Sequence, residues 1–346
     1  MRYLHARPDR RREGTARREP RPDRGRDRRL DDGQPLPLHR LLPDSRGDPG
    51  SGARERACTV TATRFHTPAT LDEALGLLDE HGDDARLFAG GTAMVTLMKQ
   101  SLLAADHLVS LQRVPGLEGV RLEADGLHIG ALTRHRDVET SDLVRVYAPL
   151  LAHVYSRVAT VRIRNAATVG GGLAHADPAQ DPPAALIALD ARVRIASRRS
   201  VRELPVEELF VDYYETALAP GEAITELIVP RQPADAGAVY LKFLPRTEDD
   251  YATVAVAALA RIVDGRAHGV RVALIAAGPT PVRATVVERA LEGAPITAEA
   301  VRRAAEAVVD AVDPLDDFRG SAGYKRDMAV VFTRRALERA LGLSPA

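Results

Sequence analysis

The sequence predicts an α+β protein, and three observations support this. Strand-like and helix-like segments alternate from about residue 60 onward. Two glycine clusters, Gly90-Gly91 and Gly170 to Gly172, each follow a short apolar run. The last third contains three strand-like segments and then three helical segments, a pattern typical of helices packed on one side of a small antiparallel sheet.

The first elements are a helix, a strand and a second helix. Thr70 is a suitable N-cap, acids follow it, and Gly82 ends the helical pattern. Apolar residues recur at helical spacing at Leu71, Ala74, Leu75 and Leu78. The apolar run 86–89 predicts a buried strand, and Gly90-Gly91-Thr92 then leads into a second helix over 93–104.

The junction at Gly90-Gly91-Thr92 has two interpretations. Free N–H groups at a helix N-terminus form an anion site, and glycine lets a phosphate approach the main chain. Alternatively, the glycines serve only a tight strand-to-helix turn that needs positive φ. The sequence lacks both the GxGxxG and the GKS/T pattern, so neither a Rossmann nor a Walker loop is predicted.

The middle of the chain predicts more strands and helices around the second glycine cluster. Strands are expected over 107–114 and 126–133, a helix over 134–144 capped by Thr133, and another over 147–159. After Gly170 to Gly172 comes an acid-rich turn with Asp177, Pro178 and Asp181, and then a helix that begins at Pro182 and Pro183. Three consecutive glycines indicate that a ligand or another backbone comes close, and two glycine cradles indicate a two-phosphate ligand.

The C-terminal third predicts a small sheet with helices. Strands are expected over 240–245, 253–264 and 269–278, with Asp264-Gly265 as the turn between the last two. Helices are expected over 281–293, 297–312 and 324–341. Their apolar faces should cover one side of the sheet.

The net charge of zero, from 48 Lys+Arg and 48 Asp+Glu, hides an uneven distribution. Residues 1–57 contain 16 arginines, no lysine and 10 acids, together with seven prolines and six glycines. Such a segment buries too little apolar surface to fold, so we expect it to be disordered or to lie upstream of a natural start near Val60. It has no apolar core of a signal peptide, and its mixed charges argue against a nucleic-acid-binding arm.

Cysteine and hydropathy limit the chemistry of the chain. Cys58 is the single cysteine, which excludes an internal disulfide, a CxxC zinc site and an iron–sulfur cluster held by several thiolates of this chain. We therefore expect no metal-ligating residues here. The apolar runs are shorter than the roughly 20 residues of a membrane span, which predicts a cytoplasmic protein.

Six segments in register resemble a known family, and together they run from about residue 59 to 341. They are LFAGGTAMVTLMKQ, IRNAATVGGGLAHADPAQDPPAALIALDA, ITELIVP, YLKFLPRTEDDYATVAVAA, VALIAAGPTPVRA and DDFRGSAGYKR. This order resembles the FAD-binding medium subunit of the molybdenum hydroxylases, the group of carbon monoxide dehydrogenase and xanthine dehydrogenase. The resemblance implies a two-subdomain FAD-binding domain of the vanillyl-alcohol oxidase (PCMH) type and a C-terminal domain with a three-stranded antiparallel sheet. It implies three parts: the segment 1–58, an FAD-binding domain over 59–236 with subdomains of about 59–115 and 116–236, and a C-terminal domain over 237–346.

The resemblance also implies FAD-contacting residues but no catalytic ones. The first loop would hold the pyrophosphate with Ala89, Gly90, Gly91, Thr92, Ala93 and Met94. The second loop would contact pyrophosphate and ribityl with Thr168, Val169, Gly170, Gly171 and Gly172, although the family often has Gly-Gly-Asn there. Asp181 would bind the adenosine or ribityl part, Ile224 would pack on the isoalloxazine, and Lys242, Asp250 and Tyr251 would lie near the ring.

These ring-side residues also have plain structural interpretations. Lys242 and Asp250 would form a surface ion pair worth under about 1 kcal/mol. Tyr251 would be a strand residue half in the core, and His175 and Asp177 would be turn residues.

The function that the resemblance implies is electron transfer. A large partner subunit would carry the molybdenum cofactor, a small partner two [2Fe-2S] clusters, and FAD in this chain would deliver electrons to an acceptor, in a dimer of heterotrimers without nucleic acid. The substrate, whether carbon monoxide, a purine or an aldehyde, and the acceptor, whether quinone, NAD, oxygen or a carrier protein, stay open. Two alternatives are a self-contained FAD-dependent alcohol oxidase of the same fold and a non-catalytic flavin-binding assembly protein.

Overall fold

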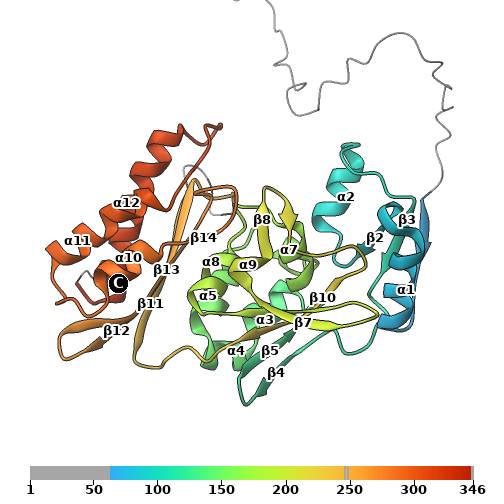
Figure 1. Cartoon of the computed structure of the whole chain (residues 1–346), viewed down its shortest axis with the longest axis horizontal. Coiled ribbons are helices and arrows are strands. Elements are labelled where there is room, and N and C mark those ends of the chain that lie inside the picture. Colours follow the sequence, from blue (N-terminus) through green and yellow to red (C-terminus); the bar gives the residue numbers. More distant parts are fainter. Residues whose placement is uncertain (1–62, 245–246, 248, 344–346) are drawn as a thin grey trace, which may run out of the picture. The chain divides into compact units, whose positions relative to one another are not determined.

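The computed structural model of the chain describes residues 63–244, 247 and 249–343, shown in Figure 1. The chain divides into two units, Met1–Thr59 and Val60–Ala346, and the described residues all belong to the second. The expectation for the arginine-rich segment 1–58, including Cys58, lies outside the described residues. Within them, no helix has the length and apolar character needed to cross a membrane.

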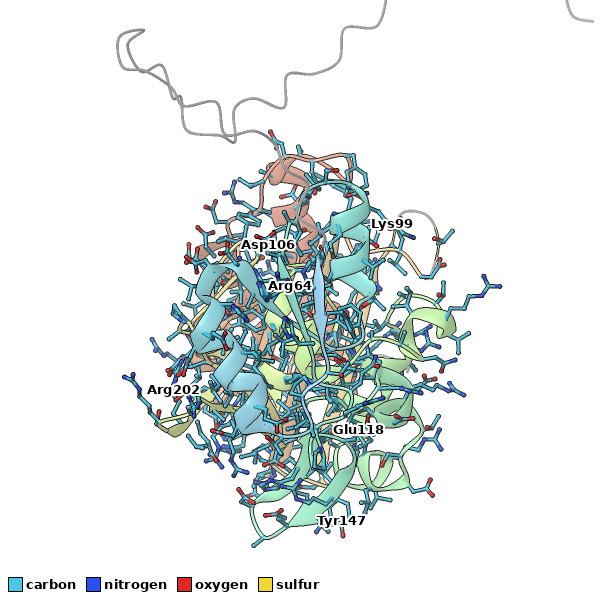
Figure 2. The ribbon with its side chains drawn as sticks, turned by 90° about the vertical axis from the view of Figure 1, so that its right-hand side faces the viewer. Arg64, Lys99, Asp106, Glu118, Tyr147 and Arg202 are labelled. Atoms are coloured by element: carbon cyan, nitrogen blue, oxygen red, sulfur yellow. The ribbon has the colours of Figure 1, made fainter. Side chains whose placement is uncertain are left out.

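The first sheet is parallel, with strand order β1-β3-β2. Its strands are β1 (Arg64–His66), β2 (Ala85–Phe88) and β3 (His107–Ser110). The amide of Arg64 donates to the carbonyl of Asp106 at 2.7 Å, which places these two residues side by side where β1 and β3 begin (Figure 2).

The helices of this region largely follow the sequence. Helix α1 (Leu71–His81) buries Ala74, Leu75 and Leu78, and the hydroxyl of its N-cap Thr70 accepts from the Glu73 amide at 3.1 Å, as predicted. Helix α2 (Thr92–Lys99) is shorter than the predicted 93–104, because Ser101 adopts a left-handed conformation with φ 57°.

The second sheet is antiparallel, with strand order β4-β5-β10-β6-β7. Its strands are β4 (Val120–Glu123), β5 (Gly126–Gly130), β6 (Arg192–Ala196), β7 (Val201–Pro205) and β10 (Ala223–Val229). The chain between β5 and β6 forms α3 (His135–Thr140), α4 (Asp142–Tyr147), α5 (Pro149–Ser156), α6 (Val161–Arg164), α7 (Val169–His175) and α8 (Pro182–Ala188). Helix α9 (Val206–Leu209) and the hairpin of β8 (Phe210–Asp212) and β9 (Glu215–Thr216) precede β10.

One predicted helix of this region is wrong in two respects. The segment 134–144 is two helices, because Ser141 ends α3 and caps α4, with its hydroxyl accepting from the Val144 amide at 3.4 Å. Thr133 does not cap α3. Its hydroxyl instead accepts from the Gly119 amide at 2.9 Å and donates to the Gly119 carbonyl at 3.0 Å, so it ties two loops together.

The C-terminal sheet has strand order β11-β12-β13-β14 and is antiparallel. Its long strands β11 (Ala236–Phe243), β12 (Val254–Val263) and β13 (Arg266–Ile275) are the three that the sequence predicts, and the two-residue β14 (Val282–Arg283) adds a fourth. Asp264 and Gly265 have φ of 49° and 71°, as the predicted tight turn requires. Helices α10 (Thr285–Leu291), α11 (Ala298–Glu306) and α12 (Ala322–Ala340) follow, with a 3₁₀ turn at Ala307–Asp310.

Both faces of this sheet are covered, whereas the sequence predicted cover on one side only. Along β12, Val254, Val256 and Ala258 pack on the side of α10 to α12. The alternate residues Ala255 and Ala257 join the core of the second sheet, where β12 and β13 contact α8. The small alanine side chains on this second face let α8 lie close to the strands. The hydrophobic cluster of the second sheet therefore extends onto this face of the C-terminal sheet.

Candidate functional site

The first glycine loop connects β2 to α2. Gly91 is the N-cap of α2 and has φ 71°, a conformation that glycine adopts without steric cost. No side chain caps this helix end. The first-turn amides of Thr92, Ala93 and Met94 therefore have no capping side chain as an acceptor, as an anion site requires.

The second glycine loop forms the first turn of α7. Thr168 is the N-cap, and its hydroxyl accepts from the Gly171 amide at 3.3 Å. The amides of Val169 and Gly170 donate to the carbonyls of Thr133 at 2.9 Å and Ala131 at 2.7 Å. These two amides are already used by the fold, so the first loop supplies more open N–H donors than the second.

The two glycine loops touch each other. A Cβ on Gly90 would lie 2.0 Å from the carbonyl oxygen of Ala166, just before the second loop, and a Cβ on Gly171 would lie 3.6 Å from the Cβ of Ala89. The two loops, residues 89–94 and 168–172, lie about 75 positions apart in the sequence and form one site, which we call the seat. This contact fits a single ligand bound by both loops.

The five glycines of the two loops are explained by different contacts. Gly90 faces a backbone carbonyl, Gly91 needs positive φ, and a Cβ on Gly170 would lie 2.6 Å from the Cβ of Ala131. At Gly171 and Gly172 a Cβ would meet only side chains, those of Thr168, Ala89, His135 and Gln180, at 2.7 Å or more. Backbone contacts and conformation therefore explain three of the five glycines, Gly171 also avoids the capping hydroxyl of Thr168, and Gly172 has only ordinary side-chain contacts to explain it.

Asp181 and Lys242 form a buried ion pair close to this region. Asp181, the N-cap residue of α8, is 4% exposed, and the Lys242 ammonium on β11 donates to its carboxylate at 3.0 Å. The Tyr240 hydroxyl donates to the other carboxylate oxygen, and Lys242 also donates to the Arg157 carbonyl at 3.3 Å. Burial raises the pKa of the Asp181 carboxyl, against the opposing effects of Lys242 and Tyr240. Lys242 is thus not in a surface pair with Asp250.

Tyr251 and the loop before α12 form a second group of polar and aromatic side chains. Tyr251 is 45% exposed and precedes β12, so it is not the half-buried strand residue of the alternative interpretation. The Asp250 carboxylate accepts from the Tyr251 amide at 2.8 Å. The Arg319 guanidinium lies 5.5 Å from the centre of the Tyr251 ring and 4.5 Å from that of Phe318.

Asp177 links this group to the second glycine loop. Its carboxylate is 8% exposed and accepts from the Ala179 amide at 2.9 Å. Burial, and next the charge of Asp177, raise the pKa of both Tyr214 and Tyr251. The Tyr214 ring lies 5.3 Å from that of His175, which is the last residue of α7 rather than a turn residue. We call His175, Asp177, Tyr214, Tyr251 and Arg319 the tyrosine cluster.

No role is predicted from the sequence for Arg319 or Tyr214. Arg319 lies in DDFRGSAGYKR, one of the segments that resemble the family. Its place between Phe318 and Gly320 in this segment was the local signal of a role. Nothing in the residues around Tyr214 distinguishes it from an ordinary surface tyrosine. Ile224, by contrast, was predicted as an FAD contact but is 6% exposed in the core, so it offers a ligand only a small edge.

The residues present fit an extended dinucleotide such as FAD. The seat combines uncapped amides with positions that lack side chains, and a pyrophosphate needs both. Among the described residues, the buried atoms without a hydrogen-bond partner include Gln180 Nε2 and Arg319 Nε. A Cβ on Gly172 would lie 3.5 Å from Gln180 Oε1, and Arg319 belongs to the tyrosine cluster, so both unpaired donors lie where a polar ligand would satisfy them.

Comparison with known families agrees with this geometry. Residues 61–232 match the family described as the FAD binding domain in molybdopterin dehydrogenase, and residues 239–340 match the CO dehydrogenase flavoprotein C-terminal domain. The carbon monoxide dehydrogenase medium chain of Hydrogenophaga pseudoflava is 35% identical over 276 residues, which cover 80% of this chain and 96% of that protein. The 6-hydroxypseudooxynicotine dehydrogenase complex subunit alpha of Paenarthrobacter nicotinovorans is also 35% identical, over 79% of this chain and 92% of that protein.

Solved structures give the same result. A chain of the carbon monoxide dehydrogenase from Hydrogenophaga pseudoflava that lacks the Mo-pyranopterin moiety matches with a TM-score of 0.79 and 36% identity, over 82% of this chain and 98% of that one. A chain of quinoline 2-oxidoreductase from Pseudomonas putida 86 matches with a TM-score of 0.77 and 30% identity, over 81% and 97%. The chain therefore belongs to the family of FAD-binding subunits of the molybdenum hydroxylases, and it is an oxidoreductase subunit of the carbon monoxide dehydrogenase medium-chain type.

Proposed function

We propose that this chain is the electron-transferring flavoprotein subunit of a heteromeric molybdenum hydroxylase. When bound, FAD would supply the redox chemistry, carrying electrons from [2Fe-2S] clusters of a small partner subunit to an external acceptor. The observation that carries the proposal is the contact between the two glycine loops, which makes one seat for a pyrophosphate. The single cysteine supports it, because one thiolate does not hold such clusters.

Each residue group has a task in this proposal. The amides of Thr92, Ala93 and Met94 hold the pyrophosphate, and Gly171 and Gly172 let it approach the backbone. Asp181 is 4% exposed and is held by Lys242 and Tyr240, so it would accept from a sugar hydroxyl only at this small exposed edge, through the lone pairs that the two donors leave free. The tyrosine cluster lies beside the flavin ring, where the positive charge of Arg319 favours the reduced, more negative form.

The proposal includes the assembly and the division of the chain. We place a molybdenum-binding large subunit and the iron–sulfur small subunit as partners in a dimer of heterotrimers, and the domains at 59–236 and 237–346. The names of the relatives support a complex of several subunits, since one of them is described as a subunit of a dehydrogenase complex and others as medium chains.

Flavin binding is tested first on the chain alone, by substitution in the seat. Gly171→Val places a branched side chain at an exposed position of α7, where the Thr168 hydroxyl, 2.7 Å from the new Cβ, has to move aside, and we expect it to lower FAD affinity at least about tenfold. Absorbance at 450 nm per chain measures bound flavin, and circular dichroism measures the fold. Gly76→Ala is the matched control, because a Cβ at Gly76 meets nothing within 4 Å. A folded Gly171→Val chain with wild-type FAD affinity would contradict the seat.

The electron-transfer role is tested by reconstitution. The flavin-loaded chain should reduce no acceptor with an organic substrate by itself, and it should do so once co-purified with molybdenum and iron–sulfur subunits. Turnover of an alcohol by the isolated chain would instead favour the self-contained oxidase. Flavin binding without any activity in the assembled complex would favour a non-catalytic assembly protein.

A further inference from the structure

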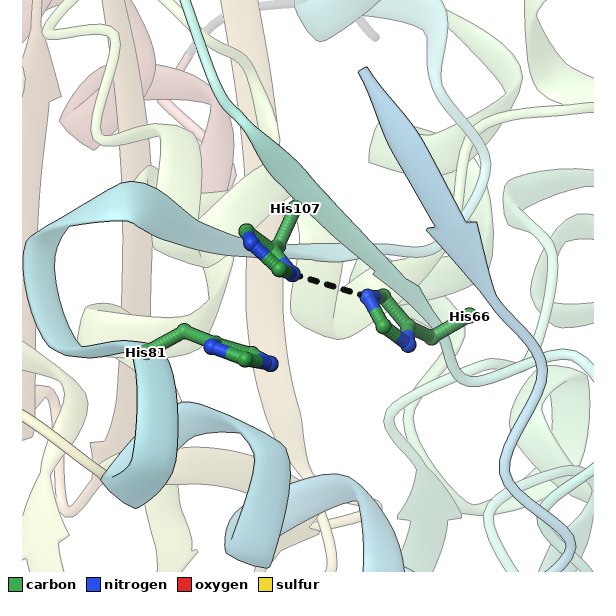
Figure 3. A group of neighbouring side chains, drawn as sticks. All are labelled: His66, His81 and His107. Carbon is green, nitrogen blue, oxygen red and sulfur yellow. Dashed lines mark hydrogen bonds between the residues drawn. The ribbon is translucent and has the colours of Figure 1, made fainter. Parts of the chain in front are cut away.

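Three histidines from three separate elements meet at the first sheet. His66 lies on β1, His81 ends α1, and His107 begins β3. A ring nitrogen of His66 (Nε2) lies 2.9 Å from one of His107 (Nδ1), and one nitrogen from each of the three rings lies within 4.8 Å of the other two. Figure 3 shows the three side chains pointing into the same space. We call these residues the histidine triad.

The three rings of the triad pack closely against one another. The His81 and His107 rings are stacked 3.6 Å apart, and the His66 and His107 rings 5.1 Å apart. Neutral imidazole is the form that ligates metal ions, because protonation occupies the lone pair.

We propose that the histidine triad binds a divalent transition-metal ion of the Zn²⁺ or Cu²⁺ type. Imidazole nitrogens suit such ions, whereas Mg²⁺ and Ca²⁺ prefer oxygen ligands. Nitrogens about 2.0–2.1 Å from a tetrahedral ion lie about 3.3 Å from one another. The 2.9 Å between the His66 and His107 nitrogens is close to that spacing, and the His81 nitrogen, within 4.8 Å, moves closer on binding. Binding needs the His81 ring to turn out of its stack on His107, and it leaves a fourth position for water.

The ion would join elements that are far apart in the sequence. Two of the ligands, His66 and His107, lie on strands of the first sheet, and His81 ends the helix between β1 and β2. One ion would therefore link three elements. His107 pairs with Ala85 at the start of β2, whereas the first glycine loop follows the end of β2. The metal site is therefore distinct from the FAD seat, and its role is to stabilise the subdomain that presents the first loop.

No sequence motif predicts this site. The three histidines are separated by 15 and 26 residues, unlike the short ligand spacings of zinc motifs. The single cysteine excludes metal sites built from several thiolates, and it therefore points to other subunits for iron–sulfur clusters. It does not exclude imidazole ligands.

The test is metal titration of the full chain, produced without a polyhistidine tag and stripped with a chelator. We expect one Zn²⁺ per chain by isothermal titration calorimetry, and a Cu²⁺ electron paramagnetic resonance spectrum with nitrogen ligands. His81→Ala and His107→Ala should each weaken Zn²⁺ binding at least about 100-fold. Zn²⁺ should also raise the melting temperature of the wild type and leave that of His81→Ala unchanged.

The control separates the triad from the other histidines of the chain. His268→Ala removes a half-exposed histidine that pairs with Glu292 outside the triad, and it should bind Zn²⁺ like the wild type. If His107→Ala does not fold, His81→Ala carries the test, because His81 lies at a helix end. Equal Zn²⁺ affinity in wild type and folded His81→Ala would overturn the proposal, as would Zn²⁺ binding that millimolar Mg²⁺ displaces.

Discussion

The pair of Lys242 and Asp181 shows what a single residue contact decides. The sequence predicts both residues near the flavin, and a surface pair of Lys242 with Asp250 is its alternative interpretation of the lysine. The fold instead buries the Lys242 ammonium, with 6% of its side chain exposed, against the 5% exposed side chain of Asp181. Tyr240 and the Arg157 carbonyl complete the hydrogen bonding of the two charges. A buried pair of this kind fixes one geometry, because either charge alone would be left in a region of low polarity.

We therefore expect Lys242→Met to lower the free energy of unfolding by about 3–5 kcal/mol, since it leaves the Asp181 carboxylate buried without a cation. The double variant Lys242→Met with Asp181→Asn should recover much of that loss. Urea denaturation measures both. Arg145→Met is the matched control, because Arg145 and Asp142 form an exposed pair at 3.8 Å whose loss should cost less than about 1 kcal/mol. Equal losses in the two single variants would contradict the buried-pair argument.

At the scale of elements, the two glycine loops interlock. The β2–α2 connection and the start of α7 approach so closely that Gly90 meets the Ala166 carbonyl. The same approach holds α7 against the end of β5, through the amides of Val169 and Gly170. The seat for a ligand is therefore a product of packing between elements, and each loop alone is only a turn.

Gly90→Ala should consequently destabilise the chain by about 1–3 kcal/mol or more, because a methyl group 2.0 Å from a backbone oxygen forces the loops apart. Gly76→Ala, in the open middle of α1, should stabilise it by about 0.5–1 kcal/mol. Thermal melting of both variants without FAD measures the difference. A Gly90→Ala chain as stable as the wild type would show that the loops do not touch as described.

At the scale of the whole described chain, one hydrophobic cluster extends from the second sheet onto the face of the C-terminal sheet that contacts α8. The C-terminal sheet packs α10 to α12 on one face and α8 on the other, so alternate residues of β12 belong to different clusters. The second glycine loop is anchored from inside this structure as well. His135, 5% exposed, donates from Nε2 to the carbonyl of Thr168, the N-cap of α7, at 3.2 Å.

Buried His135 predicts a loss of stability in acid. Burial, as the main cause, lowers the pKa of His135 from 6.5 to about 4. The folded state therefore resists protonation, and the His135 contribution is complete above about pH 6.5 and is lost as the pH falls towards 4, by roughly 3 kcal/mol in total. Urea denaturation across this range should show a smaller loss in His135→Phe than in the wild type. Parallel pH profiles for the two chains would refute the assignment.

The sequence predicted most elements correctly where local signals were strong. Thr70 caps α1, Pro182 and Pro183 begin α8, and Asp264-Gly265 turns between β12 and β13, because capping, proline geometry and positive φ act over a few residues. It was wrong where a distant partner decides. Thr133 bonds Gly119 instead of capping a helix, and the partner of Lys242 is Asp181, which neither interpretation of the lysine had paired with it.

By itself the sequence determined the α+β class, the two glycine loops, the family, and the absence of several thiolates for iron–sulfur clusters. The tertiary structure alone decided that the loops form one seat, that Asp181 and Lys242 neutralise each other, that Arg319 joins Tyr251, and that His66, His81 and His107 converge. The physical reason is range. Backbone conformation follows from neighbouring residues, whereas ion pairs, close backbone contacts and metal-ligand sets need partners that only packing brings together.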